Sequence, residues 1–408
     1  MQSVVVVGAS LAGLRACETL RTDGFAGRVT LIGAEAEHPY DRPPLSKKLL
    51  AGEWEPDRIR LRKPEDFAGL DLDLRLGRRA VQLDVDDRRV ALDDGEAVPY
   101  DGLVIATGAA PRRLPGQPQL DGIVELRTLA DSLDLRRRLS GGSARVTVIG
   151  AGFIGLEVAA TAREAGCEVT VLEGAPAPLI RGLGADLGAA VAAVHTEHGV
   201  DLRCDVRIDG FDERDGQVVA VRLADGSVVP SDVVVVGIGV TPATEWLEGS
   251  GLELRDGIVC DETLWTGVAG VFAAGDCARW PNRIFHGFDD VEMRVEHWTN
   301  AAEQGAAAAR SLLAIAEGRL AEGYESVPFF WSDQYDRRIQ FVGRAHGGDD
   351  IHVFTGDTTG QFAALYGFQG RLRGVLGVSM PKKVMPFRAL LAARATWDEA
   401  LARAAELA

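Results

Sequence analysis

Apolar and polar residues follow the same order in two parts of the chain. The apolar run at 4–7 is followed by a glycine and by an amphipathic segment that begins near Leu11, and the apolar run at 145–149 is followed in the same way. Short apolar runs that end in glycine indicate buried strands, and amphipathic segments indicate helices that cover them. The pattern therefore predicts two units, each with a strand, a turn, a helix and a further strand.

A second repeat lies further along each unit. The segments 93–111 and 224–242 align without gaps, and each reads as a turn, a short strand and a buried strand ending in glycine, at Gly108 and Gly239. The apolar segment GVFAAGDCARW at 270–280 comes after the second copy. We therefore expect one nucleotide-binding architecture in two copies, the first of which is discontinuous in sequence.

The remaining residues differ in character. An alanine-rich stretch at 301–316 suits a helix, and the segments FFWSDQYDRRIQFVG, HVFTG, FAALYGF and LRGVLGV read as strands without a glycine fingerprint. The predicted fold class is α/β, with two Rossmann-like nucleotide-binding domains and a smaller C-terminal α+β domain. The expected domains are residues 1–110 together with 243–303, residues 111–242, and residues 304–408.

Glycine fingerprints follow the first strand of each unit. The first, GASLAG, has Gly8 and Gly13 but Ser10 in place of the middle glycine, and Glu35 ends the next strand. The second, GAGFIG, is complete, and Glu173 ends the strand after it. Such glycines let the backbone approach a pyrophosphate at a helix N-terminus, and the acidic residue can bind a ribose hydroxyl. A tight turn without a ligand is the alternative for one fingerprint, but two in one chain favour two dinucleotide sites.

The composition argues against several classes of protein. The chain has 408 residues, 46% of them hydrophobic, and a formal net charge of 44 − 60 = −16. A strongly acidic chain is a poor general binder of nucleic acid, and no apolar run reaches the roughly eighteen residues that a membrane helix needs. The apolar run at 4–7 has no basic segment before it, which a secretory signal requires. We expect a cytoplasmic protein without a nucleic-acid or membrane partner.

The five cysteines and seven histidines show no metal-ligand spacing. The cysteines stand far apart and form no CxxC or CxxxxC motif, which fits reduced, mostly structural thiols in the cytoplasm. The histidines form no HxH or HExxH cluster. We therefore expect no metal site and no redox-active cysteine pair.

The segment PYDRPPLSK at 39–47 combines rigidity with polar side chains. Two adjacent prolines do not fit inside a helix or a central strand, and Tyr40, Arg42, Ser46 and Lys47 surround them. A plain surface turn and a loop that holds a ligand are both open at this point of the argument.

Eight motifs, taken together and in order, allow a family to be suggested. They are GASLAG, PYDRPPLSK, VIATGAAPR, GAGFIGLEVAA, VGIGVTP, AAGDCA, RVEHWTNA and FFWSDQY. In this combination the sequence resembles the FAD-dependent NADH:ferredoxin reductases of bacterial oxygenase systems, of the putidaredoxin reductase and aromatic-ring dioxygenase reductase type. The resemblance implies a glutathione-reductase-like fold with an FAD domain, an inserted NAD domain and a C-terminal domain, and it implies FAD and NADH as cofactors.

The resemblance also implies roles for individual residues. It places the Lys47 cation near the flavin atom that receives hydride, where a positive charge stabilises the charge that develops during transfer, and it places Glu157 opposite Lys47; these two are the candidate catalytic residues. A carboxylate at Glu173 accepts hydrogen bonds from a ribose 2′-hydroxyl and repels a 2′-phosphate, so NADH is expected over NADPH. The FAD-binding residues implied are Gly8, Ala12, Gly13, Ala34, Glu35, Arg42, Lys47, Val81, Ala106, Thr107, Gly108, Arg127, Asp276 and Trp298, and the NADH-binding residues are Gly150, Gly152, Ile154, Gly155, Glu173, Arg181 and Gly239.

The absence of a CxxC or CxxxxC motif bears on how electrons are expected to leave the flavin. Disulfide reductases of this fold need a cysteine pair near the flavin, and Cys17 falls within the first expected helix, where it reads as buried. Electrons are then expected to pass singly to a [2Fe–2S] ferredoxin that serves an oxygenase, either a cytochrome P450 or a ring-hydroxylating dioxygenase. An NADH oxidase, a rubredoxin or quinone reductase and an NADH-responsive flavoprotein sensor remain open, as do a monomer and a homodimer. The candidate basic residues for ferredoxin docking are Lys382, Lys383, Arg388 and Arg310.

Overall fold

The computed structural model describes residues 1–288 and 292–408, which form two compact units. Each unit is assembled from segments that are separated in sequence. Unit 1 contains residues 1–41, 59–110 and 241–328, and unit 2 contains residues 42–58, 111–240 and 329–408.

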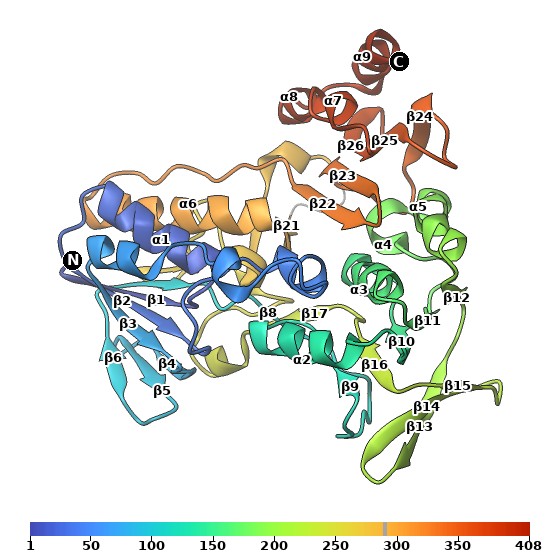
Figure 1. The fold of residues 1–408 in the computed structure, drawn as a ribbon. Coiled ribbons are helices and arrows are strands. Elements are labelled where there is room, and N and C mark those ends of the chain that lie inside the picture. The colour runs from blue at the N-terminus through green and yellow to red at the C-terminus, as the bar shows by residue number, and fades with distance from the viewer. Residues whose placement is uncertain (289–291) are drawn as a thin grey trace. The chain divides into compact units, whose positions relative to one another are not determined.

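A five-stranded parallel sheet forms the centre of unit 1 (Figure 1). Four consecutive valines make its central strand, and all four are buried, as expected for a strand that is covered on both faces. The order of the strands across the sheet is β19 (Val271–Ala273), β7 (Gly102–Ile105), β1 (Ser3–Val7), β2 (Arg28–Gly33) and β3 (Leu72–Leu76).

Two long helices pack closely on each other in unit 1. They are α1 (Leu11–Thr22) and α6 (Trp298–Ala316), which lie side by side in Figure 1. A Cβ atom at Gly305 would lie only 2.1 Å from the Ala12 carbonyl oxygen, so the two backbones approach as closely as glycine allows. The helix expected over the alanine-rich stretch at 301–316 is confirmed, since this stretch forms most of α6.

Smaller elements complete unit 1. One antiparallel sheet contains β4 (Ala80–Asp84), β5 (Arg89–Leu92) and β6 (Ala97–Pro99), and another sheet contains β18 (Ile258–Val259), β20 (Ala278–Pro281) and β21 (Glu292–Met293). The chain passes between the units within β8 (Ala109–Pro111) and β17 (Val240–Pro242), among other points.

Unit 2 has its own five-stranded parallel sheet, and four of its strands repeat the connectivity of unit 1, whereas the fifth precedes the other four in sequence instead of following them. The strand with the glycine turn is again central, and the strand that ends at a later glycine is again its neighbour. Helices α2 (Leu129–Leu139), α3 (Phe153–Glu164), α4 (Ile180–Leu183) and α5 (Ala185–Glu197) accompany the sheet. The order of strands is β12 (Asp201–Arg203), β11 (Glu168–Leu172), β10 (Arg145–Ile149), β16 (Val233–Val236) and β9 (Ile123–Val124), with β13 (Ile208–Arg214), β14 (Gln217–Leu223) and β15 (Val228–Pro230) in a separate antiparallel sheet.

The C-terminal part of unit 2 is an antiparallel sheet with three short helices. One apolar core joins this sheet to the parallel sheet, since Val148, Leu156, Phe341 and Tyr366 belong to the same buried cluster. The Tyr366 hydroxyl donates a hydrogen bond to the Leu183 carbonyl oxygen at 2.8 Å. The sheet order is β22 (Phe329–Gln334), β23 (Arg337–Gly343), β26 (Arg371–Val378), β25 (Phe362–Phe368) and β24 (Asp350–Gly356), followed by α7 (Pro381–Val384), α8 (Phe387–Ala392) and α9 (Trp397–Leu407).

The expected α/β fold class with two Rossmann-like halves and a C-terminal α+β part is confirmed by these sheets. The exact division into three domains stays a prediction. Within residues 1–288 and 292–408, no helix is long and apolar enough to cross a bilayer. The same residues hold no group of three or more histidine, cysteine, aspartate or glutamate side chains that could bind a metal ion.

Candidate active site

The glycine turn of unit 1 is a cradle of closely packed backbone. Gly8 has a φ of +118°, and a Cβ there would lie 2.0 Å from the Ala106 carbonyl oxygen. A Cβ at Gly13 would lie 1.9 Å from the Gly8 carbonyl oxygen. Both glycines are therefore required for the turn to close against β7 and open into α1. The turn presents the N-terminus of a twelve-residue helix, where the helix dipole favours an anion.

Two further segments border this cradle. Gly275 approaches Ala12, because a Cβ at Gly275 would lie 3.1 Å from the Ala12 Cβ, and Asp276 follows it in a 3₁₀ turn. The Gly275 N–H donates to Gln304 Oε1 at 2.8 Å, while the buried Nε2 of Gln304 has no partner among the described residues. Gln304 therefore holds Gly275 beside the glycine turn. The sequence did not reveal this contact, because nothing in AAEQG marks Gln304.

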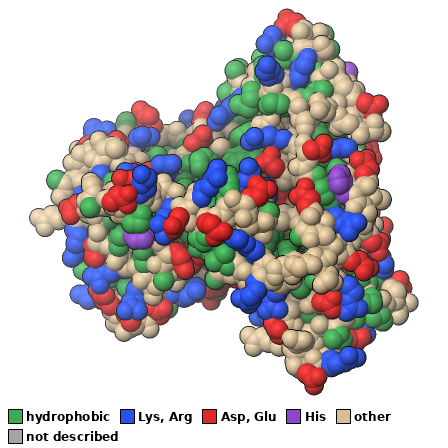
Figure 2. Space-filling view, in the orientation of Figure 1, with side chains coloured by type: hydrophobic (Ala, Val, Ile, Leu, Met, Phe, Trp, Pro, Cys, Tyr) green, Lys and Arg blue, Asp and Glu red, His purple; other side chains and the backbone are tan. Residues whose placement is uncertain are grey.

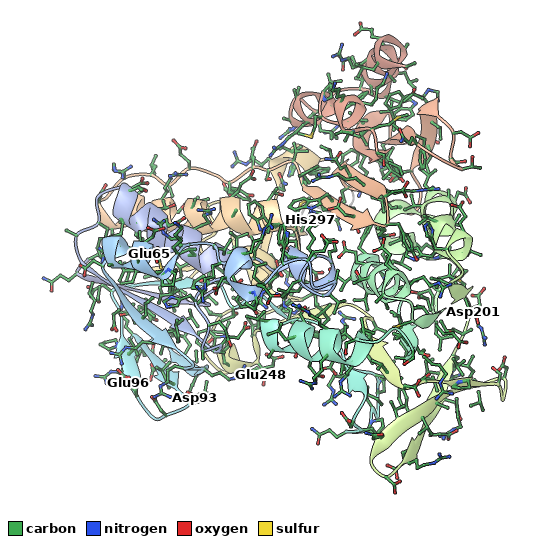
Figure 3. All side chains as sticks on the ribbon, viewed as in Figure 1. Glu65, Asp93, Glu96, Asp201, Glu248 and His297 are labelled. Carbon is green, nitrogen blue, oxygen red and sulfur yellow. The ribbon has the colours of Figure 1, made fainter. Side chains whose placement is uncertain are left out.

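The remaining expected FAD residues of unit 1 are distributed around the sheet. The Tyr40 hydroxyl donates to the Glu35 carboxylate, and the Thr107 hydroxyl donates to the Ala243 carbonyl oxygen at 2.8 Å. Trp298 donates its Nε1–H to Asp41 Oδ1 at 2.6 Å, and it follows His297, the N-cap residue of α6 that Figure 3 labels. Gly108 lies after β7 with a φ of +71°, Ala34 is exposed after β2, and Val81 is 45% exposed on β4.

The glycine turn of unit 2 repeats this geometry and leaves a space above it. A Cβ at Gly150 would lie 2.4 Å from the Gly237 carbonyl oxygen, and a Cβ at Gly155 would lie 2.2 Å from the Gly150 carbonyl oxygen. A Cβ at Gly152 would meet no atom within 4 Å. Gly152 is the N-cap residue of α3, so this open space lies at the N-terminus of a twelve-residue helix. The turn fits the phosphates of a second dinucleotide.

Glu173 is held at the edge of this turn by backbone donors. Its carboxylate oxygens accept hydrogen bonds from the Ala151 N–H at 2.6 Å and the Ala175 N–H at 2.8 Å. An ionised carboxylate has about four acceptor positions, so both oxygens keep capacity for a ribose hydroxyl. Arg181 is exposed, and its Nη1 would lie 3.9 Å from a Cβ at Gly239. Ile154, at the start of α3, is 48% exposed.

The Glu157 carboxylate accepts hydrogen bonds from three side chains. Glu157 lies on α3 and is 5% exposed. Its Oε2 accepts from the Lys47 ammonium at 2.8 Å and from the Ser46 hydroxyl, and its Oε1 accepts from the Ser332 hydroxyl at 2.6 Å. The expected pairing of Lys47 with Glu157 is therefore present. A buried carboxylate is tolerated only when it is paired and hydrogen-bonded, and these donors supply that compensation.

Residues 42–47, here called the proline loop, are a structural part of unit 2. Residues Pro43–Ser46 form a 3₁₀ turn whose last three residues are buried. The Ser132 hydroxyl on α2 donates to the Leu45 carbonyl oxygen at 2.7 Å, and the Thr161 hydroxyl on α3 donates to the Ser46 carbonyl oxygen at 2.9 Å. The loop is therefore held by two helices, and the interpretation as a plain surface turn is wrong.

Arg42 and Arg127, two further expected FAD residues, meet in unit 2. Arg42 Nη1 donates to the Arg127 carbonyl oxygen at 2.5 Å. The next residue, Thr128, forms a capping box with Asp131 at the start of α2. The capping box fixes the backbone that Arg42 contacts. The assignments of all these residues to FAD or NADH stay predictions.

Four of the five cysteines are buried. All five are free thiols. Burial raises the pKa of Cys17 to about 12 and also raises the pKa of Cys260 and Cys277. Because the thiolate is the reactive form of cysteine, these buried thiols are poor nucleophiles near neutral pH.

The candidate docking residues differ in their availability. Lys382 is exposed on α7, whereas Lys383 is half-buried and donates to the Leu407 carbonyl oxygen at the end of α9. Arg310 is paired with Asp23 at 3.3 Å in unit 1. Acidic and basic side chains are interspersed on the visible surface (Figure 2). Lys383 therefore has a structural role, and Lys382 is the better test of docking.

Comparison with known proteins identifies the family. A family model described as pyridine nucleotide-disulphide oxidoreductase matches residues 2–305, and a model described as reductase C-terminal matches residues 329–407. The chain belongs to the pyridine nucleotide-disulphide oxidoreductase family.

Its relatives narrow the subclass. Rhodocoxin reductase of Rhodococcus erythropolis is 39% identical over 392 residues, which cover 96% of this chain and 89% of the relative. Putidaredoxin reductase CamA of Pseudomonas putida is 37% identical over 385 residues, covering 93% of this chain and 89% of the relative. The reductase in a crystal structure of a covalent putidaredoxin reductase–putidaredoxin complex matches with a TM-score of 0.90 and 35% identity, over 96% of this chain and 93% of that chain. The resemblance deduced from the motifs is confirmed.

The open space at Gly152 gives a prediction about dinucleotide binding. Gly152→Ala should leave the urea midpoint of unfolding unchanged, because the new Cβ meets no protein atom, but it should raise the KM for NADH by about tenfold, equivalent to roughly 1.4 kcal/mol of binding. Gly150→Ala is the contrasting variant, since it strains the turn and should lower the urea midpoint. An unchanged KM in Gly152→Ala would show that the dinucleotide does not approach this turn.

Proposed function

We propose that this chain transfers electrons from NADH through noncovalently bound FAD to a ferredoxin. The observation that carries the proposal is that one chain contains two glycine turns, each opening a twelve-residue helix after a buried parallel strand. Two dinucleotide cradles suit an exchange of electrons between two dinucleotides. The relatives named as ferredoxin–NAD(+) reductase components, including that of the p-cumate 2,3-dioxygenase system of Pseudomonas putida at 35% identity, support the same two redox partners, ferredoxin and NAD.

The residues of the chain bind, orient and supply charge in this function. Bound FAD would supply the chemistry that links transfer of two electrons as a hydride to their release one at a time. We expect Gly8 and Gly13 to let its diphosphate approach the backbone in unit 1. In unit 2, Glu157 holds the Lys47 ammonium in one position, and this fixed cation is the charge-stabilising group that the resemblance assigns to hydride transfer.

The acceptor is a one-electron carrier. The sequence contains no CxxC or CxxxxC motif to take up electrons, so the electrons are expected to leave singly. We assign the carrier to the [2Fe–2S] ferredoxins, with an oxygenase as the indirect partner. The free thiols fit a cytoplasmic location. The oligomeric state that we propose is a monomer or a homodimer. A water-forming NADH oxidase from Lactobacillus brevis matches with a TM-score of 0.85 but only 20% identity, which shows the shared fold alone.

A steady-state assay tests the proposed function against its alternatives. With NADH, the chain should reduce cytochrome c rapidly only when a [2Fe–2S] ferredoxin is added, because the ferredoxin carries single electrons. Oxygen consumption without ferredoxin should be slow. Fast oxygen consumption would indicate an oxidase, and a long-lived reduced flavin with negligible turnover would indicate a sensor.

Glu173 gives a prediction about cofactor preference. The wild-type chain should have a higher kcat/KM for NADH than for NADPH, and Glu173→Gln should narrow that gap by about tenfold, equivalent to roughly 1.4 kcal/mol, because the charge that repels a 2′-phosphate is removed. Glu168→Gln, at the other end of β11, is the matched control and should leave the ratio unchanged. Equal kcat/KM values for the two cofactors in the wild-type chain would refute the assignment.

Lys382 gives a prediction about docking. Lys382→Glu should raise the KM for ferredoxin and weaken its dependence on salt, since charges at the rim of an interface act mainly on association. Lys63→Glu in unit 1 makes the same change in net charge, from −16 to −18, and should leave this KM unchanged. Ferricyanide, which needs no protein docking, should be reduced at the wild-type rate by both variants. If ferricyanide reduction by Lys382→Glu falls in parallel, the damage lies in the fold and the docking assignment fails.

A further inference from the structure

A chain of hydrogen bonds leads from Glu157 through β22 to α5. The Ser332 hydroxyl donates to Glu157 Oε1 at 2.6 Å, and Gln334 Nε2 donates to Ser332 Oγ at 3.1 Å. The Gln334 Oε1 lies 2.9 Å from His195 Nε2. All four residues belong to unit 2, where α3, β22 and α5 carry them (Figure 1).

The direction of every bond in this chain is determined by chemistry. A carboxylate only accepts, so the Ser332 proton points to Glu157 and leaves the Ser332 oxygen to accept from the Gln334 amide nitrogen. The Gln334 oxygen must then accept, which places the His195 proton on Nε2. Each donor therefore points toward Glu157, and hydrogen bonds aligned in this way polarise and strengthen one another.

Burial keeps this direction fixed. Ser332 and His195 are fully buried, and Gln334 is 1% exposed. Burial, together with a smaller effect of the neighbouring His198, outweighs the hydrogen bond to Gln334 and lowers the pKa of His195 to about 4, so the ring is neutral near pH 7. His195 Nδ1 is buried and has no partner among the described residues, so a second proton there would be unsatisfied.

The two oxygens of Glu157 are held by different segments. The proline loop contacts Oε2 through Ser46 and Lys47, whereas β22 contacts Oε1 through Ser332. Holding both oxygens fixes the plane of the carboxylate. A fixed plane gives the Lys47 ammonium one position rather than several.

We propose that Ser332, Gln334 and His195 are positioning residues that fix the Glu157 carboxylate, and through it the Lys47 ammonium, in the orientation required for hydride transfer from NADH. The proposal rests on the proposed function in one respect, namely that Lys47 supplies the cation for that step. The competing interpretation is a buried polar network that only stabilises the packing of β22 on α3 and α5.

Flavin reduction under anaerobic conditions separates the two interpretations. In the holoenzyme, Ser332→Ala should lower the limiting rate of flavin reduction by NADH about tenfold, without changing the NADH concentration at half-saturation. Ser332→Thr retains the hydroxyl and should recover most of the rate. Ser231→Ala is the matched control, because Ser231 is also fully buried in unit 2 but bonds to Thr147 and Val229. A Ser332→Ala rate equal to that of Ser231→Ala would overturn the proposal.

A double-mutant cycle supplies a readout that does not depend on activity. Ser332 and Lys47 bind opposite oxygens of Glu157, so Ser332→Ala and Lys47→Met should shift the urea midpoint of the holoenzyme non-additively if they act through that carboxylate. Ser231→Ala and Lys47→Met should shift it additively. Additive shifts in the first pair would overturn the proposal.

These tests distinguish failure of the inference from failure of the proposed function. Neither measurement uses ferredoxin, so a chain that reduces no ferredoxin can still show the slowed flavin reduction and the non-additive midpoints. Conversely, normal ferredoxin reduction with an unaffected Ser332→Ala variant would retain the function and remove the positioning role.

Discussion

The burial of one carboxylate constrains the arrangement of unit 2. Removing an unpaired charge from water costs several kcal/mol, and Glu157 is 5% exposed. Its donors come from the proline loop and from β22, separated from it by 111 and 175 positions for Ser46 and Ser332. Loop, helix and C-terminal sheet must therefore meet at a single point for the carboxylate to be tolerated. The same contacts leave the Lys47 ammonium with a defined place and partner.

A different constraint shapes the two dinucleotide cradles. In each unit the turn after the central strand packs backbone against backbone. A Cβ atom at Gly13 or Gly155 would lie only 1.9 or 2.2 Å from a backbone carbonyl oxygen, so neither position can carry a side chain without a clash. Gly152 is free of such contacts, and we predict that it leaves space for a ligand. The repeated strand order of the two parallel sheets places both turns at equivalent positions. One architecture is thus present in two copies, each with a turn that can approach a dinucleotide.

The sequence predicted what depends on neighbouring residues. Gly150, Gly152 and Gly155 lie in one short motif, and the four valines of β1 form one run, so local patterns were enough to predict a turn, a strand and a cradle. The contact of Ser332 with Glu157 joins residues far apart in sequence, and no local pattern marks it although FFWSDQY was recognised as a motif. The packing of the proline loop in unit 2, through Ser132 and Thr161, could not be predicted either, because these contacts also join residues far apart in sequence. The contact of Gln304 with Gly275 was likewise found only in the structure.

The stoichiometry of electron transfer tests the central claim most directly. Limiting NADH is mixed without oxygen with the purified chain and an excess of oxidised [2Fe–2S] ferredoxin, and the reduced ferredoxin is counted spectroscopically. The account predicts two ferredoxins reduced for each NADH oxidised, because a hydride carries two electrons and the iron–sulfur cluster accepts one. The account would be contradicted if the ferredoxin stayed oxidised while the chain retained the electrons of NADH. It would also be contradicted if the ferredoxin were reduced only after another reductase replaced the chain.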